Sequence, residues 1–248
     1  MAPLSKNKIK YIHSLEQKKI RKEERVFLAE GPKLVGDLLE YFPCRFLAAT
    51  SLWLQSHPNI YAGEIAEVSQ EELSRASLLK TPQQVLAILE QPQYTLTPDI
   101  ARHSLCLALD DVQDPGNMGT IIRLADWFGI EDIICSQNTV DVYNPKTVQA
   151  TMGGIARVRV HYTSLPDFIR SQGKEIPVFG TFLDGQNMYE QPLAANGLIV
   201  MGNEGNGVRD ETIAMSDASL YIPIDTMESL NVGVAAGIVM YTFKEVSL

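Results

Sequence analysis

Short apolar runs alternate with amphipathic segments along most of the chain. In the first ninety residues, runs of strand length occur at 26–29, 44–49 and 84–89. Residues 5–22 predict one helix, because apolar residues recur there at three-residue steps with lysines on the other faces. A second helical stripe covers 34–39. This alternation predicts a small α/β domain.

The alternation is stronger from Ser104 onward. Continuous apolar runs there predict buried strands of the parallel type, at 105–109, 133–135, 158–160, 177–182, 198–201 and 220–224. Helical segments lie between them, and in 232–243 the apolar residues recur at i, i+3, i+4, i+7 and i+8. The pattern predicts an α/β fold with five or six parallel strands and helices on both faces of the sheet.

The segment 91–98 has two prolines, no charge and no periodicity, so we expect a linker there. It separates two predicted domains, at 1–92 and 103–248. Charge is also distributed unevenly, because the net charge of the 248 residues is −9 while residues 1–33 hold nine Lys/Arg and four Glu. A basic amino-terminal end could meet phosphate, but a solvated helix face explains this charge pattern equally well.

Cysteines and histidines give no sign of a metal site or a disulfide framework. Cys44, Cys106 and Cys135 stand apart among apolar neighbours, and the four histidines lack ligand spacing. The longest nearly apolar stretch, 232–241, is about half of the ~20 residues that a membrane helix needs. We therefore expect no metal, no membrane association and a cytoplasmic location.

Three polar loops each follow a predicted strand, at the edge where open parallel sheets bind ligands. They are 110–123, 201–208 and 222–232. The second loop alternates glycines with Asn and Glu, which allows its backbone to approach a ligand closely. It is neither a P-loop nor a dinucleotide fingerprint. By itself, such a loop is explained equally well as a plain glycine-rich turn.

Two of these loops place polar residues beside a helix. We expect Asn117 to cap the helix of the first loop, and Arg123 to lie two turns into that helix, either snorkelling or aimed into a cleft. Ser229 and Asn231 precede the last helix, where capping explains only one of them.

Together the three loops resemble the motifs of the SpoU branch of the SPOUT RNA methyltransferases. The matching motifs are Asn-x-Gly-x-x-x-Arg at 117–123, Gly-Asn-Glu-Gly-x-Gly at 202–207 and Ile-Pro-Ile…Ser-Leu-Asn-Val-x-Val-Ala-Ala-Gly-Ile at 222–238. The resemblance covers 104–245 and extends more weakly over 5–90. It implies a parallel-sheet methyltransferase domain with a carboxyl-terminal deep trefoil knot, which forms a homodimer. A small RNA substrate-binding domain similar to ribosomal protein L30e precedes it.

The resemblance also implies S-adenosylmethionine-dependent 2′-O-methylation of a ribose in tRNA or rRNA, without a metal. The implied catalytic residues are Arg123, Asn117, Glu204, Ser229 and Asn231. The implied cofactor-binding residues are Thr181, Phe182, Leu183, Gly202, Asn203, Ile222 and Leu230. Because an arginine stays protonated, we expect Arg123 to hold a phosphate and to polarise the ribose oxygen.

Two other functions remain open from the sequence. The first is a non-catalytic RNA-binding or ribosome assembly factor with a methyltransferase fold, and the second is a SPOUT enzyme that methylates a base. The presence of Arg123, Glu204, Ser229 and Asn231 together argues against a mere binder. The Ser-Leu-Asn loop together with Arg123 favours the ribose over a base.

Overall fold

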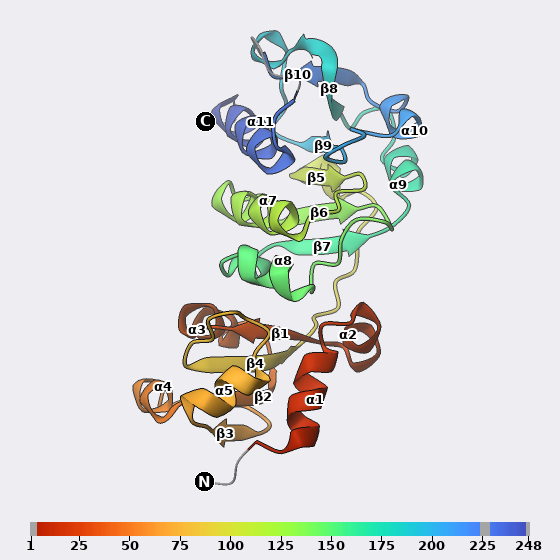
Figure 1. Ribbon diagram of the computed structural model, residues 1–248. Helices are drawn as coiled ribbons and strands as arrows, with labels where there is room; N and C mark the ends of the chain where they lie inside the picture. The colour runs from red at the N-terminus through yellow and green to blue at the C-terminus, as the bar shows by residue number, and fades with distance from the viewer. Residues whose placement is uncertain (1–3, 224–228, 247–248) are drawn as a thin grey trace. The chain divides into compact units, whose positions relative to one another are not determined.

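The computed structural model describes residues 4–223 and 229–246, which form two compact units (Figure 1). The first unit consists of residues up to 93 together with 141–156. The second unit consists of 94–140 and the residues from 157 onward. The chain therefore leaves the second unit at 140, contributes a segment to the first, and returns at 157.

A four-stranded mixed sheet lies at the centre of the first unit. Its order is β1-β4-β2-β3, in which β4 is antiparallel to β1 and β2, and β3 is parallel to β2. The strands are β1 (Val26–Glu30), β2 (Cys44–Ala49), β3 (Ile65–Glu67) and β4 (Val85–Glu90). The helices are α1 (Lys6–Ser14), α2 (Lys18–Glu24), α3 (Pro32–Leu39), α4 (Ser51–Ser56), α5 (Gln70–Ala76) and α8 (Pro145–Ala150), with a 3₁₀ turn at Gly154–Ala156. All three strands predicted for this part of the chain are present.

The prediction of a single helix over 5–22 is wrong, because the chain forms two helices there, α1 and α2, with a turn between them. Ser5 caps α1 by accepting a hydrogen bond from the backbone N–H of Lys8 (3.1 Å). In the turn, the Arg21 guanidinium donates to the carbonyls of Leu15 and Glu16, both at 2.8 Å. These carbonyls need no further helical partner, so the chain can change direction there.

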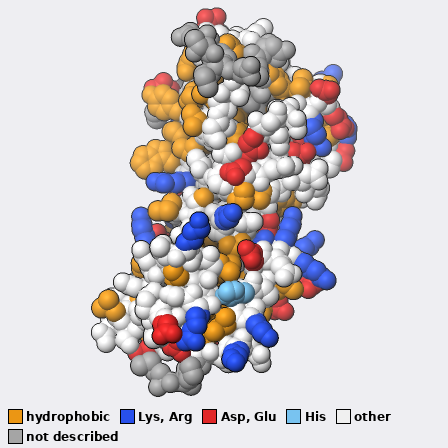
Figure 2. All heavy atoms as spheres, viewed as in Figure 1, with side chains coloured by type: hydrophobic (Ala, Val, Ile, Leu, Met, Phe, Trp, Pro, Cys, Tyr) orange, Lys and Arg blue, Asp and Glu red, His pale blue; other side chains and the backbone are white. Residues whose placement is uncertain are grey.

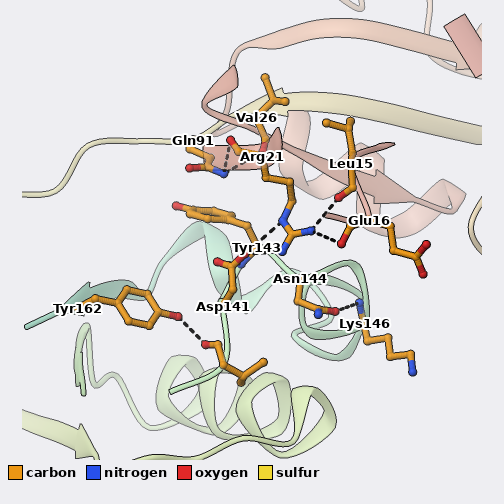
Figure 3. A network of polar contacts seen from close by, with 11 residues as sticks. Leu15, Glu16, Arg21, Val26, Gln91, Asp141, Tyr143, Asn144, Lys146 and Tyr162 are labelled. Carbon is orange, nitrogen blue, oxygen red and sulfur yellow. Dashed lines mark hydrogen bonds and ion pairs between the residues drawn. The ribbon is translucent and has the colours of Figure 1, made fainter. Parts of the chain in front are cut away.

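Arg21 also fixes the segment 141–156 to the first unit (Figure 3). Its side chain is buried, at 1% exposure, and binds the Asp141 carboxylate with Nη2 at 2.5 Å and Nε at 3.2 Å. Beside this ion pair, the rings of Phe27 and Tyr143 lie 5.1 Å apart, and α8 packs on β1. The segment is thus an integral part of the unit's core.

The second unit is built on a six-stranded, fully parallel sheet, which confirms the predicted fold class. Its order is β10-β8-β9-β5-β6-β7. The strands are β5 (Leu105–Leu109), β6 (Asp132–Cys135), β7 (Arg159–Tyr162), β8 (Val178–Asn187), β9 (Gly197–Met201) and β10 (Ala218–Tyr221). The helices are α6 (Ile100–His103), α7 (Pro115–Trp127), α9 (Leu165–Ser171), α10 (Asp210–Ile213) and α11 (Val232–Val246), with a 3₁₀ turn at Met188–Glu190.

Helices cover both faces of this sheet (Figure 1). α7 and α11 pack together on one face, and α9 and α10 lie on the other. Every residue of the central strands β5, β6 and β9 is buried, as expected for parallel strands between two helical layers. Within the described residues, none of the helices is both long and apolar enough to cross a membrane.

We expect Arg21→Met to lower the free energy of unfolding by about 3–5 kcal/mol, because it leaves the Asp141 carboxylate without its buried partner. Urea denaturation checks this through the fluorescence of Trp53, which lies in the first unit, in a Trp127→Phe background. The matched control is Arg45→Met, which removes only exposed ion pairs and costs about 1 kcal/mol or less. Equal losses for the two variants contradict the assigned role of Arg21.

Candidate functional site

The loops that follow β5 and β9 meet at the carboxyl edge of the parallel sheet, and Glu204 joins them. One carboxylate oxygen accepts hydrogen bonds from the backbone N–H of Asp114 (3.1 Å) and the side-chain amide of Asn117 (3.0 Å). The other accepts from the backbone N–H of Gln113 (3.2 Å). Glu204, the acidic residue of the second motif, therefore holds the loop of the first motif in position.

These donors also set the protonation of Glu204. Partial burial alone would raise the pKa of its carboxyl, but the hydrogen bonds from Asn117 and from the backbone outweigh burial and lower the pKa below its ordinary value. Glu204 is consequently an anion at neutral pH, and it serves the site as an acceptor of hydrogen bonds.

Asn117 connects the third motif to the other two. Its side-chain oxygen accepts a hydrogen bond from the amide of Asn231 (2.9 Å), while its own amide donates to Glu204. The Asn231 oxygen in turn accepts from the backbone N–H groups of Gly233 (2.9 Å) and Val234 (3.3 Å), at the start of α11. One residue from each motif thus takes part in a single hydrogen-bonded chain.

The expectation that Asn117 caps α7 is wrong. The cap is Asp114, whose carboxylate accepts from the backbone N–H of Asn117 at 2.8 Å, and Pro115 opens the helix. Because Asp114 satisfies the helix end, the Asn117 side chain is free to bind Glu204 and Asn231.

The second loop owes its tight shape to Gly202 and Asn203. A Cβ on Gly202 would lie 2.2 Å from the carbonyl carbon of Gly207, so only glycine fits there. The Asn203 oxygen accepts from the backbone N–H groups of Gly205 (2.9 Å) and Asn206 (3.0 Å), and its amide donates to the carbonyl of Asp111 (2.7 Å). These two N–H groups are therefore engaged within the loop itself.

An ion pair between the buried Asp110 and the partly exposed Arg209 was not predicted from the sequence. Asp110, at the end of β5, is 0% exposed and accepts from Arg209 Nη2 (2.6 Å), Nε (2.8 Å) and backbone N–H (3.1 Å). Its other donor is the Thr212 hydroxyl, at 2.9 Å. The sequence offered one signal for this pair, namely the position of Asp110 at the end of an apolar strand. Its partner could not be predicted, because Arg209 lies 99 residues further along the chain.

Two predicted catalytic residues lie outside this chain of hydrogen bonds. Arg123 lies on α7, about 9 Å along the helix axis from Asn117, and its side chain is exposed. Ser229 is exposed next to the start of α11. Residues 224–228 of the third loop lie outside the described residues.

The predicted cofactor residues come from neighbouring parts of the same sheet. Thr181, Phe182 and Leu183 lie on β8, between β9 and β10, and the Thr181 hydroxyl donates to the carbonyl of Val200 (2.8 Å). The Leu183 side chain lies outside what the structure describes. Ile222 follows β10, and Leu230, with 41% of its surface exposed, precedes α11.

This arrangement suits a neutral or cationic ligand held by backbone and amide groups. Where the structure describes the chain, His, Cys, Asp and Glu form no group of three that could hold a metal. The polar groups are mostly amides and backbone atoms, which orient a ligand without taking a proton from it. A transfer reaction governed by alignment is the chemistry that such a site supports best.

Comparisons with known proteins agree with this geometry. Residues 104–241 match the model of the SpoU rRNA Methylase family, and residues 6–87 match the MRM3-like substrate binding domain. The chain is 32% identical over 243 residues to 23S rRNA (guanosine(2553)-2′-O)-methyltransferase RlmP of Bacillus subtilis, covering 96% of each chain.

Solved structures are similar over the full length as well. A protein from Porphyromonas gingivalis that is assigned to the TrmH family of RNA methyltransferases superposes with a TM-score of 0.90 at 39% identity, over 98% of this chain and 99% of the other. An AdoMet-bound rRNA methyltransferase from Sinorhizobium meliloti gives a TM-score of 0.86 at 32% identity, over 100% and 98% of the two chains.

We expect Glu204→Gln to lower the free energy of unfolding by about 1 kcal/mol at neutral pH, because one amide oxygen replaces two acceptors in a partly exposed site. Folding lowers the pKa of Glu204, so ionised Glu204 stabilises the folded protein. This stabilisation is complete above the ordinary Glu pKa and is lost as the pH falls through the pKa of Glu204 in the folded protein. Thermal denaturation from pH 7 to pH 3 should show the difference from wild type shrinking. Glu211→Gln, at an exposed ion pair, is the control. A pH-independent difference contradicts this account.

Proposed function

The chain belongs to the SpoU rRNA methylase family, and from this premise we propose that it methylates the 2′-hydroxyl of a ribose in rRNA, with S-adenosylmethionine as the donor. The observation that carries the proposal is the hydrogen-bonded chain Glu204–Asn117–Asn231, because it unites the three family motifs in one site. An RNA-binding protein without catalysis has no need of this arrangement.

The cofactor fits the edge of the sheet where β8, β9 and β10 end. The tight turn at Gly202 leaves backbone without a side chain there, Asn203 follows it in the loop, and Thr181 lies on the adjacent strand β8. Ile222, after β10, and Leu230, before α11, complete this set. S-adenosylmethionine supplies an electrophilic methyl group when bound. These residues would hold its adenosine and methionine parts, and Phe182, Leu183 and Gly202 would contribute through the backbone.

The protein's own groups align the ribose and prepare its oxygen. Arg123 keeps its positive charge, so it serves by holding the adjacent phosphate and stabilising negative charge on the 2′-oxygen as the proton leaves. Glu204 and Asn117 keep the first loop ordered, and Ser229 and Asn231 position the acceptor. In the transfer, a bond would form between the 2′-oxygen and the methyl carbon as the carbon–sulfur bond breaks, and the hydroxyl proton would pass to solvent water.

The first unit supplies the RNA-binding surface in this proposal. The match of residues 6–87 to a substrate binding domain supports it. Figure 2 shows Lys and Arg side chains over α1 and α2, and Lys6, Lys10 and Lys22 are exposed there. Such groups neutralise phosphates, and they offset the acidic charge of the rest of the chain.

We further propose that the second unit forms a homodimer and that its carboxyl-terminal part is knotted. Large apolar side chains are exposed along α7 and α11, with Trp127 at 83%, Val234 at 54% and Tyr241 at 52%, and Figure 2 shows hydrophobic side chains gathered on this side. A contiguous apolar surface of this kind is typical of a protein interface. Cytoplasmic location remains a prediction.

We expect Arg123→Ala to reduce methyl incorporation into rRNA by about 100-fold or more, because the loss of one donor that stabilises the transition state lowers kcat by about that factor. The thermal stability of the variant should equal that of the wild type. The measurement is transfer of tritiated methyl from S-adenosylmethionine. Arg170→Ala, an exposed arginine of α9, is the control.

The labelled RNA is then digested to nucleosides. 2′-O-methylated nucleosides support the proposed reaction, whereas methylated bases or unlabelled RNA contradict it. Normal turnover by Arg123→Ala removes that residue from the mechanism.

We expect Trp127→Glu to shift the protein from dimer to monomer in sedimentation velocity, because it places a charge in the proposed interface. Tyr61→Glu is the control, since Tyr61 is 90% exposed in the first unit. Wild-type protein that sediments as a monomer at micromolar concentration would refute the dimer.

A further inference from the structure

A cavity of about 170 Å³ opens in the first unit, with walls from distant parts of the chain. The residues around the start of α3, together with Gln83, form one side, and Gln149 and Met152 form the other. Gln83 falls within the part that matches the substrate binding domain, whereas Gln149 and Met152 fall within the part that matches the methylase. The cavity is therefore composite in sequence although it lies in one structural unit.

The second wall belongs to a segment that is anchored to the first unit. The buried Arg21–Asp141 ion pair anchors the segment 141–156 at its beginning (Figure 3). Further along, a Cβ on Gly153 would lie 3.4 Å from the Asp37 carboxylate of α3, so the segment lies in close contact with the first wall. Pre-formed walls reduce the entropy lost when a ligand binds.

The polar groups around the cavity have unused hydrogen-bonding capacity. In the described part of the chain, the side chains of Lys33, Gln83 and Gln149 take no part in a hydrogen bond. Lys33 and Gln83 are exposed at the rim, and Met152 presents its thioether with 48% exposure. Two amides, an ammonium and a polarisable apolar surface thus face one small space.

The size and chemistry of the cavity select among ligands. It is smaller than the roughly 300–1,000 Å³ of pockets that enclose a whole cofactor. The carboxylates of Glu30 and Asp37 also line it, which disfavours an isolated phosphate. Both oxygens of the buried Glu30 are already bonded, to the Ser77 hydroxyl and to the backbone N–H of Leu78. The Asp37 carboxylate and the two amides match the hydrogen-bonding edge of a nucleobase, Met152 can pack on its ring, and Lys33 can reach the adjoining phosphate.

We propose that this cavity binds one unpaired nucleotide of the RNA substrate, with Gln149 and Met152 of the segment 141–156 as part of the recognition surface. The proposal rests on the proposed function, since it assumes an RNA substrate. Proteins recognise RNA sequence mainly through unpaired nucleotides whose base edges are accessible. RNA recognition then depends on a segment whose two ends continue covalently into the parallel sheet of the methyltransferase unit.

The test uses the full-length protein with Gln149→Ala and, separately, Lys33→Ala. The probe is unmodified 23S rRNA transcribed in vitro, and both methyl transfer and direct binding by fluorescence anisotropy are measured. We expect KM for RNA and the dissociation constant to rise about tenfold for each variant, as one lost hydrogen bond or ion contact implies. The kcat and the KM for S-adenosylmethionine should stay unchanged.

Matched controls are Gln55→Ala and Lys80→Ala, two exposed residues of the same unit outside the cavity. If the cavity variants bind the transcript as tightly as the controls do, the cavity proposal is overturned while methylation by the wild type still supports the proposed function. If wild type binds the transcript but transfers no methyl group to it, the proposed function fails, and weaker binding by the cavity variants still supports the cavity. A wild type that does not bind the transcript overturns both.

Discussion

The amide of Asn117 holds the candidate active site together, because it is the link between loops that follow different strands. Its nitrogen binds Glu204 and its oxygen binds Asn231, so both ends of the amide dipole are used. An aspartate at this position could not donate to Glu204 and would place two carboxylates side by side. Asn117 can serve in this way because Asp114 caps the helix in its place, and its amide is one of the donors that lower the pKa of Glu204 and keep that carboxylate ionised. The geometry of the site thus follows from one neutral residue with a donor and an acceptor.

Two ion pairs with buried or largely buried carboxylates secure the surroundings of this site and of the first unit. Asp110–Arg209 fixes the end of the second loop to β5, and Arg21–Asp141 fixes the segment 141–156 to the first unit. Breaking the Arg21–Asp141 pair is expensive because both side chains are largely buried, whereas Arg209 is partly exposed and only its Asp110 partner is fully buried. Each pair is of modest value to overall stability, because desolvation opposes the Coulomb attraction. Their contribution is therefore to geometry: each carboxylate accepts a guanidinium in one orientation, which determines the position of a segment distant in sequence.

The sequence predicted those parts of the fold that depend on local pattern. Apolar runs located the strands of both sheets, and the parallel sheet follows from buried strands alternating with helices. The break between α1 and α2 was missed, because it depends on the Arg21 guanidinium binding the carbonyls of Leu15 and Glu16. The membership of 141–156 in the first unit was missed, because it depends on Arg21 meeting Asp141, 120 residues away. The resemblance of the motifs predicted that Asn117, Glu204 and Asn231 share one site, but it did not predict which atoms bond to one another. Whether Asn117 or Asp114 caps the helix, for example, depends on which hydrogen bonds the folded loops make available.

The location of Arg123 bears on how the site is completed. Arg123 and Trp127 are four residues apart on α7, so they lie on the same helix face. That face is exposed, and Trp127 continues the apolar surface that α11 extends through Val234 and Tyr241. An arginine at the margin of an interface keeps its guanidinium available for a phosphate, while the apolar residues beside it bury their surface against a second copy. In the proposed dimer, association would remove water from around Arg123 and lower the local dielectric. Charges attract more strongly in a lower dielectric, so Arg123 would interact more strongly with the negative charge that develops on the ribose 2′-oxygen. Assembly and catalysis would then share one helix.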